Sequence, residues 1–228
     1  MVKTNKQSEN MYDLSTVLDF DALDSVRPGT SLLVAGPAMS GKEALAMDVL
    51  KDGVGNGEGA VVVTTNDQAS SVVDDFRTDV PEMDDSQLGV VDCRGDNSGG
   101  EAAQSSAYIH HVNSPGDLTG IGIGITKALE GLHKSGRDQG RLALVSLSTM
   151  LTYTDKKTVF KLCHILSSRL DSAGYVGVFT IDSGAHDDQT LQVIKQAFDG
   201  LIEFREEDGT RQARVMGLTS QPSEWKEL

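Results

Sequence analysis

The sequence predicts an α/β fold, a mostly parallel sheet flanked by helices with an antiparallel β-hairpin at its C-terminal end. Short apolar runs bounded by turn residues, as expected for strands buried on both faces, alternate with longer segments of helical periodicity. The last segment, 199–220, instead has two strand-like halves around Asp208-Gly209, a two-residue hairpin signal. A parallel sheet with an antiparallel edge follows from this order.

Residues 1–12 are polar and lack periodicity, which predicts a flexible arm. Residues 13–228 then form a single domain, because a chain of 228 residues suits one α/β domain. Apolar runs predict strands at 31–36, 60–65, 87–93, 141–148 and 175–182. Helical patterns occupy 42–53, 68–79, 113–136, 154–174 and 186–198. The polar, glycine-rich segment 93–106 predicts a loop.

The helix boundaries have their own signals. The pattern 42–53 ends at a cluster of glycines, 113–136 begins after Ser114-Pro115, and 154–174 closes on Gly174. Gly120 and Gly124 lie one turn apart within 113–136, where they permit close approach of another helix or of a partner. We favour ordinary packing within the domain over such an approach, although a helical glycine costs about 1 kcal/mol and therefore needs some reason.

The composition is acidic throughout. There are 34 Asp and Glu against 20 Lys and Arg, a net charge of −14. Such a surface repels phosphate backbones, which argues against nucleic-acid binding. It is typical of proteins from a salt-rich cytoplasm, with an ordinary acidic cytosolic protein as the alternative. No apolar run reaches the roughly 18 residues of a membrane span, so we expect a cytoplasmic protein without one.

Two cysteines, Cys93 and Cys163, stand far apart in the sequence. Neither has a neighbouring Cys or His at metal-ligand spacing, and no disulfide framework is indicated. We expect both to be small core residues.

Residues 36–43 read GPAMSGKE and match the phosphate-binding pattern G-x-x-x-x-G-K-[ST] in every position except the last. In such a loop the backbone N–H groups converge on phosphate, the helix N-terminus adds positive charge, and the lysine reaches the β- and γ-phosphates. The pattern follows an expected strand and precedes an expected helix, which is the required context. We therefore expect ATP or ADP to bind through Gly36, Pro37, Ala38, Met39, Ser40, Gly41, Lys42 and Glu43.

Glu43 occupies the position where a hydroxyl normally binds Mg²⁺. Its carboxylate either coordinates the ion or points away as an acid in the first helical turn, and we favour the second. A phosphate-binding enzyme also needs a carboxylate at the end of a nearby strand. Spacing favours Asp182 or Asp92, because the strand 141–148 has no acid.

This chain resembles the KaiC-like branch of the RecA superfamily of ATPases in the segments GPAMSGK, SLSTMLTY and FDGLIEFRE with RVMGL. More closely, SPGDLTGIGI, SLSTMLTYTDKKTVFKLCHIL and GVFTID resemble haloarchaeal HTR-like proteins of that superfamily. The resemblance covers residues 12–225. It implies a RecA-type P-loop core, ATP as the ligand, and a role in regulation or signalling.

The same resemblance implies that the catalytic half of the site is lost. Val145 stands where the family has its magnesium-binding aspartate, and Asn66 and Asp67 stand where it has catalytic glutamates. Gly217 and Thr219 replace the Lys and Arg that reach the neighbouring subunit's γ-phosphate. The remaining candidates are Asp67 and Asp182 for catalysis, and Glu43 and Asp182 for Mg²⁺.

Three functions are left open. We favour a regulatory protein that binds ATP or ADP, with or without Mg²⁺, and hydrolyses it little or not at all. The alternatives are an active Mg²⁺-dependent ATPase with replacement acids and a scaffold that binds no nucleotide. A regulatory protein is the expected partner, and we expect a monomer or dimer because the intersubunit cations are missing, with a ring as the alternative.

Overall fold

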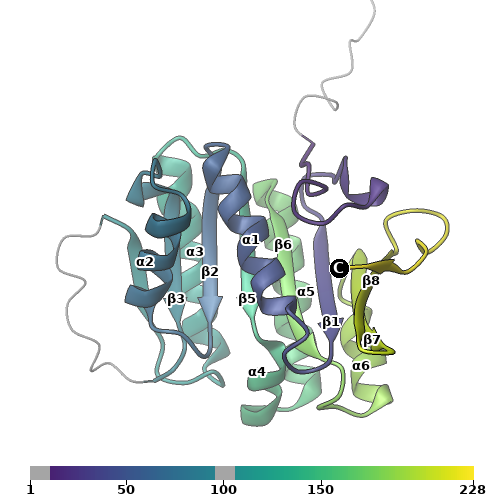
Figure 1. Cartoon of the computed structure of the whole chain (residues 1–228). Helices are drawn as coiled ribbons and strands as arrows, with labels where there is room; N and C mark the ends of the chain where they lie inside the picture. The colour runs from purple at the N-terminus through teal and green to yellow at the C-terminus, as the bar shows by residue number, and fades with distance from the viewer. Residues whose placement is uncertain (1–10, 96–105) are drawn as a thin grey trace, which may run out of the picture.

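The computed structural model describes residues 11–95 and 106–228, so most of the expected N-terminal arm and of the 93–106 loop lies outside the described residues. The parallel strands are β1 (Ser31–Gly36), β2 (Gly59–Thr64), β3 (Leu88–Asp92), β4 (Tyr108–His111), β5 (Gly140–Val145), β6 (Val176–Asp182) and β7 (Gly200–Glu207). The antiparallel strands are β8 (Thr210–Met216) and β9 (Lys226–Glu227). They form one sheet in the order β4-β3-β2-β5-β6-β1-β7-β8-β9 (Figure 1). The α/β prediction with a C-terminal hairpin is confirmed.

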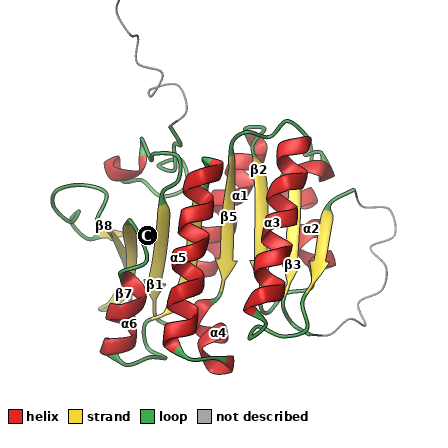
Figure 2. Cartoon of the chain, turned by 180° about the vertical axis from the view of Figure 1, so that it is seen from behind, coloured by secondary structure: helices red, strands yellow, loops and turns green. Residues whose placement is uncertain are grey.

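Helices cover both faces of this sheet. They are α1 (Lys42–Gly55), α2 (Ala69–Asp79), α3 (Leu118–Lys134), α4 (Leu147–Tyr153), α5 (Lys156–Ala173) and α6 (Asp188–Lys195). Figures 1 and 2 show α1 and α2 on one face and α3, α5 and α6 on the other. Each layer buries its own apolar cluster against the sheet. Because the parallel strands all end at one edge, the loops that follow β1, β2, β5 and β6 meet there.

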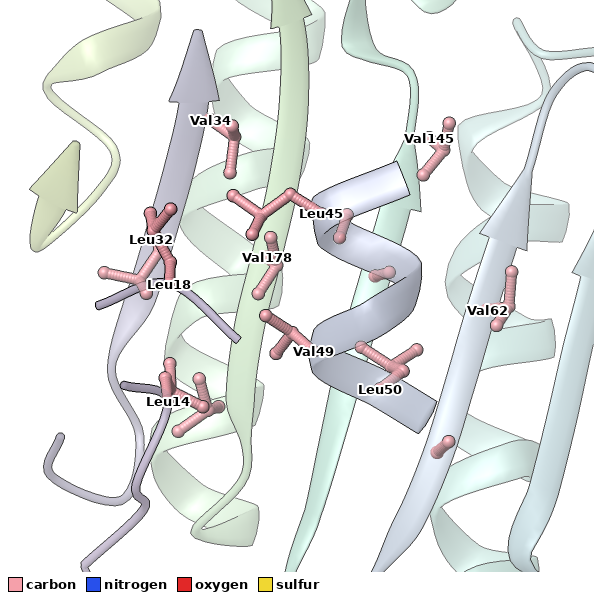
Figure 3. Close-up of a cluster of buried hydrophobic side chains, with 14 of the residues drawn as sticks. Leu14, Leu18, Leu32, Val34, Leu45, Val49, Leu50, Val62, Val145 and Val178 are labelled. Carbon is pink, nitrogen blue, oxygen red and sulfur yellow. The ribbon is translucent and has the colours of Figure 1, made fainter. Parts of the chain in front are cut away.

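Helix α1 holds its place by an apolar stripe that packs on the strands beneath it. Leu45, Val49 and Leu50 point toward the sheet, where Val178 and Val62 lie on β6 and β2 (Figure 3). Full burial of each such side chain stabilises the fold by about 1.5–3 kcal/mol. The start of α1 is thereby fixed against the C-terminal edge of the sheet.

Three details differ from the sequence predictions. The strand expected at 141–148 ends at Val145, because the Ser146 hydroxyl accepts from the Thr149 N–H and starts α4, which was not predicted. Strand β4 was also not predicted. Tyr12, which was placed in the flexible arm, is buried, and its hydroxyl donates to the Gly174 carbonyl at 2.8 Å.

The described part of the chain contains no helix with the length and apolar character needed to cross a membrane.

Candidate functional site

The loop between β1 and α1 has a backbone that its residue types permit. Gly41, the residue before α1, has φ 92°, a left-handed conformation that glycine adopts without strain. At Gly36 a Cβ would lie 2.7 Å from Ser40 Oγ and 2.8 Å from Phe204 Cβ, so only glycine fits. Among the described residues, no side chain caps the N-terminus of α1. Its first N–H groups are therefore available to an anion, as at other uncapped helix starts.

Lys42 lies at the centre of this site and is only 1% exposed. Its Nζ donates to the Pro37 carbonyl at 2.9 Å and to Asp182 Oδ1 at 3.3 Å. Glu43 Oε1 lies 3.1 Å from the same Nζ. The ammonium is thus folded back on its own loop and paired with two carboxylates, which offsets the cost of burying its charge.

The remaining loop side chains leave the loop open to solvent. Met39 is 93% exposed and has φ 59°, and Pro37 and Ala38 are also exposed. Ser40 is buried, and its Oγ has no hydrogen-bond partner among the described residues. The loop is therefore not filled by Met39, and Glu43 is directed to Lys42 instead.

Asp182 is brought to the loop by strand order, since β6 pairs with β1 and Gly36 is opposite Asp182. Its backbone N–H donates to Ser148 Oγ at 2.8 Å, and this hydroxyl also lies 2.8 Å from His186 Nε2. Sequence reasoning selected Asp182 but missed Ser148 and His186. Ser148 belongs to the unpredicted helix α4, and no spacing in the sequence links it to a residue that follows β6.

Val145 ends β5, which is separated from β1 by β6. It is 6% exposed and belongs to the core cluster beneath α1 (Figure 3). A depression of 130 Å³ beside the first turn of α1 is lined by Glu43, Ala44, Met47, Val62, Thr64, Asp67, Val72 and Val145. The structure therefore brings Glu43 and Asp67 to one depression. The wall of this depression that the sheet forms is apolar at Val145.

The β7–β8 hairpin forms a wall beside the loop. Glu203 is the last β7 residue paired with β1, and β7 runs on to Glu207, roughly 13 Å further. Phe204 on β7 packs in the core beneath α1. Because side chains alternate along a strand, Glu206 lies on the same face of the hairpin as Phe204. Arg211 on β8 pairs with Glu206 and therefore also lies on this face. Arg211 Nη1 lies 3.3 Å from the position that a Cβ on Gly41 would take. The hairpin thus brings a cation from the same chain to the loop, which sequence reasoning missed.

The comparison with known families identifies the main part of this chain. Residues 29–204 match the model of a family of unknown function, DUF7504. The chain belongs to this family. No curated protein matches the sequence. The DUF7504 segment includes the loop, Lys42, Val145 and Asp182, and it ends within β7, so Arg211 lies beyond the matched residues.

Asp92, the other strand-end acid, is already occupied within the fold. It is 2% exposed, and its carboxylate accepts hydrogen bonds from Arg94 and from the Ala69 N–H. Burial opposes ionisation, but these hydrogen bonds outweigh it and lower the pKa of Asp92 below its ordinary value. Asp92 therefore anchors α2 to the sheet and is not available as a metal ligand.

The other residues that stand where KaiC-like proteins have catalytic side chains have local structural roles. Gly217 has φ 87°, and a Cβ there would lie 2.7 Å from the Asp199 carbonyl, so a lysine does not fit this backbone. Thr219 donates to the Gln221 carbonyl at 2.6 Å. Asn66 is exposed in the turn after β2. Within residues 11–95 and 106–228, no three His, Cys, Asp or Glu side chains gather as a metal site.

Proposed function

We propose that this chain is a RecA-type, KaiC-like regulatory protein that binds ATP or ADP at the β1–α1 loop and hydrolyses it little or not at all. The observation that carries the proposal is Lys42, a buried cation at an uncapped helix start, beside a left-handed Gly41. Backbone N–H groups, a helix N-terminus and a lysine are the donors that a nucleotide triphosphate or diphosphate requires. Arg211 adds a second cation on the hairpin side of the loop.

Weak hydrolysis is inferred from the other half of the site. Efficient phosphoryl transfer depends on a positioned metal, a positioned water and a cation at the transferred phosphate. Val145 supplies no metal ligand at the end of β5. If Mg²⁺ accompanies the nucleotide, Glu43 and Asp182 are the residues near Lys42 that can hold it, and the ion would neutralise phosphate charge.

The contacts of Lys42 provide a route from nucleotide to the protein surface. A bound phosphate competes with Pro37 and Asp182 for the ammonium group, because Lys42 Nζ has a limited number of donors. Asp182 is tied through its N–H to Ser148 on α4. We infer that nucleotide binding changes the position of Asp182 and with it the start of α4, as expected for a ligand that binds two conformations unequally.

An active ATPase is the second candidate, and one observation favours it. Asp182 lies beside Lys42 and next to the Ser148–His186 pair, where a carboxylate and an imidazole can position water. In that case Asp182→Asn abolishes phosphate release while ATP binding persists. The proposed regulator instead shows no release of phosphate over hours, with or without this substitution.

The test is equilibrium binding of ATP with and without Mg²⁺ in high-salt buffer, followed by phosphate release. We expect saturable binding that Lys42→Ala abolishes. A nucleotide at about 100 times its Kd adds about 2.7 kcal/mol of stability, which raises the Tm by roughly 5–10 °C. Lys51→Ala is the matched control, since Lys51 is on the same helix but pairs with Asp79 at 2.5 Å. Absence of binding at millimolar ATP by the folded wild-type protein would leave the scaffold as the function.

A further inference from the structure

Residues of α3 and α5 line a groove of 610 Å³. These two helices lie on the face of the sheet opposite to α1 (Figure 2). The floor of the groove includes the buried Leu162 and Leu166, and Ile123 and Ile165 stand at its sides, 47% and 41% exposed. The lining residues on α3 run over 118–130, which is about 18 Å at the rise of an α-helix. The groove is therefore apolar, open, and about three helical turns long.

Glycines on α3 show where another backbone can approach. The sequence suggested Gly120 and Gly124, but a Cβ on either would lie within 2.6 Å of Asp117 or His110 of the same chain, so both have internal roles. Gly122 is different, because it lines the groove and a Cβ there would meet no described residue within 4 Å. Gly122 places no side chain in the groove, so a partner helix can approach α3 closely beside the Arg169 guanidinium, which donates to the Gly122 carbonyl.

The charge of the rim indicates the chemistry of the partner. Lys127, Lys161 and Arg169 line the groove, and Glu130 is the one acid among its described lining residues, on a chain whose net charge is −14. Arg169 donates to the Gly122 carbonyl at 3.0 Å, so its guanidinium lies across the two helices. A local excess of cations around an apolar groove is complementary to an apolar stripe flanked by carboxylates.

We propose that this groove binds an amphipathic helix of a partner protein, with its apolar side on Ile123 and Ile165 and its acidic flanks on Lys127 and Lys161. Helix-in-groove recognition uses anchors at i, i+3, i+4 and i+7, and the groove has the length for one such set. The described residues that line the groove include none of the β1–α1 loop, and the proposal does not rest on nucleotide binding there.

The probe is a designed helical peptide of about 18 residues with leucines at that spacing and glutamates on both flanks, compared with an analogue that has lysines in their place. Fluorescence anisotropy should show saturable binding of the glutamate peptide, about tenfold tighter or more than the lysine peptide. Because the whole chain is negative, non-specific attraction favours the lysine peptide. Tighter binding of the glutamate peptide would therefore report the cations at the groove rim. Equal or reversed affinities, or no binding, overturn the proposal.

Gly122→Ala and Gly131→Ala form a matched pair on α3. Both positions have open space, and Gly131 lies outside the groove, so each alanine should raise the Tm by about 2–4 °C through helix propensity. Only Gly122→Ala should weaken the glutamate peptide, by about fivefold. Equal effects of the two variants on binding contradict a groove site. A concentration-dependent dimer that Ile165→Glu disrupts would identify a second copy as the occupant and overturn the acidic-helix partner.

Discussion

Arg211→Ala should weaken ATP binding by about five- to tenfold while the fold is kept, if the β1–α1 loop binds nucleotide as proposed. The structure places Arg211 Nη1 3.3 Å from the position of a Cβ on Gly41, at the start of α1. Two unit charges about 4 Å apart interact by about 1 kcal/mol in water and about 4 kcal/mol at an effective dielectric constant of 20. Arg211 is exposed, so the lower limit applies. A loss of about 1–1.4 kcal/mol corresponds to a five- to tenfold change in Kd.

The assay is a titration of the folded protein with a fluorescent ATP analogue, with Arg205→Ala as the control. Arg205 is on the other face of the same hairpin, where it donates to Gln212 and lies 4.0 Å from the Trp225 ring centroid. Both variants lose one positive charge, but only Arg211 is near the loop, and Arg211→Lys should keep much of the affinity. An equal loss for Arg205→Ala would show a long-range charge effect, and no loss for Arg211→Ala would refute the contact.

Three further predictions concern stability and reactivity. Arg141 is 2% exposed and makes a bidentate ion pair with Glu58, with both bonds at 2.8 Å. Arg141→Ala should therefore lower the free energy of unfolding by about 3–5 kcal/mol in chemical denaturation. A loss below about 1 kcal/mol would contradict a structural role. The pKa of Asp92 in the folded protein lies below its ordinary value of 3.8. The ionised carboxylate therefore stabilises the fold above pH 3.8, and this stability is lost as the pH falls through the folded-state pKa. Asp92→Asn should flatten this part of the dependence of unfolding free energy on pH. Burial raises the pKa of Cys93 and Cys163 to about 12, so a thiol reagent at pH 8 should label neither in the native protein and both after denaturation.

Local signals predicted most of the secondary structure. The Asp208-Gly209 hairpin was predicted correctly because both residues have positive φ, 51° and 77°, which few other pairs adopt easily. Gly174 likewise ends α5 in a left-handed conformation. Helix α4 was missed, since its seven residues directly continue an apolar strand and its start depends on the hydroxyl of Ser146.

The sequence by itself determined the alternation of strands and helices, the loop GPAMSGKE at a strand–helix junction, and the valine at the end of β5. These depend on residue type and spacing within short segments, where backbone preference and burial act locally. Only the tertiary structure decided which side chains meet Lys42. Asp182 reaches it because β6 pairs directly with β1, and Arg211 reaches the loop because β7 runs past the end of β1. Strand order and register are set by the packing of the whole sheet, so contacts between residues more than a hundred positions apart have no signal in either segment alone.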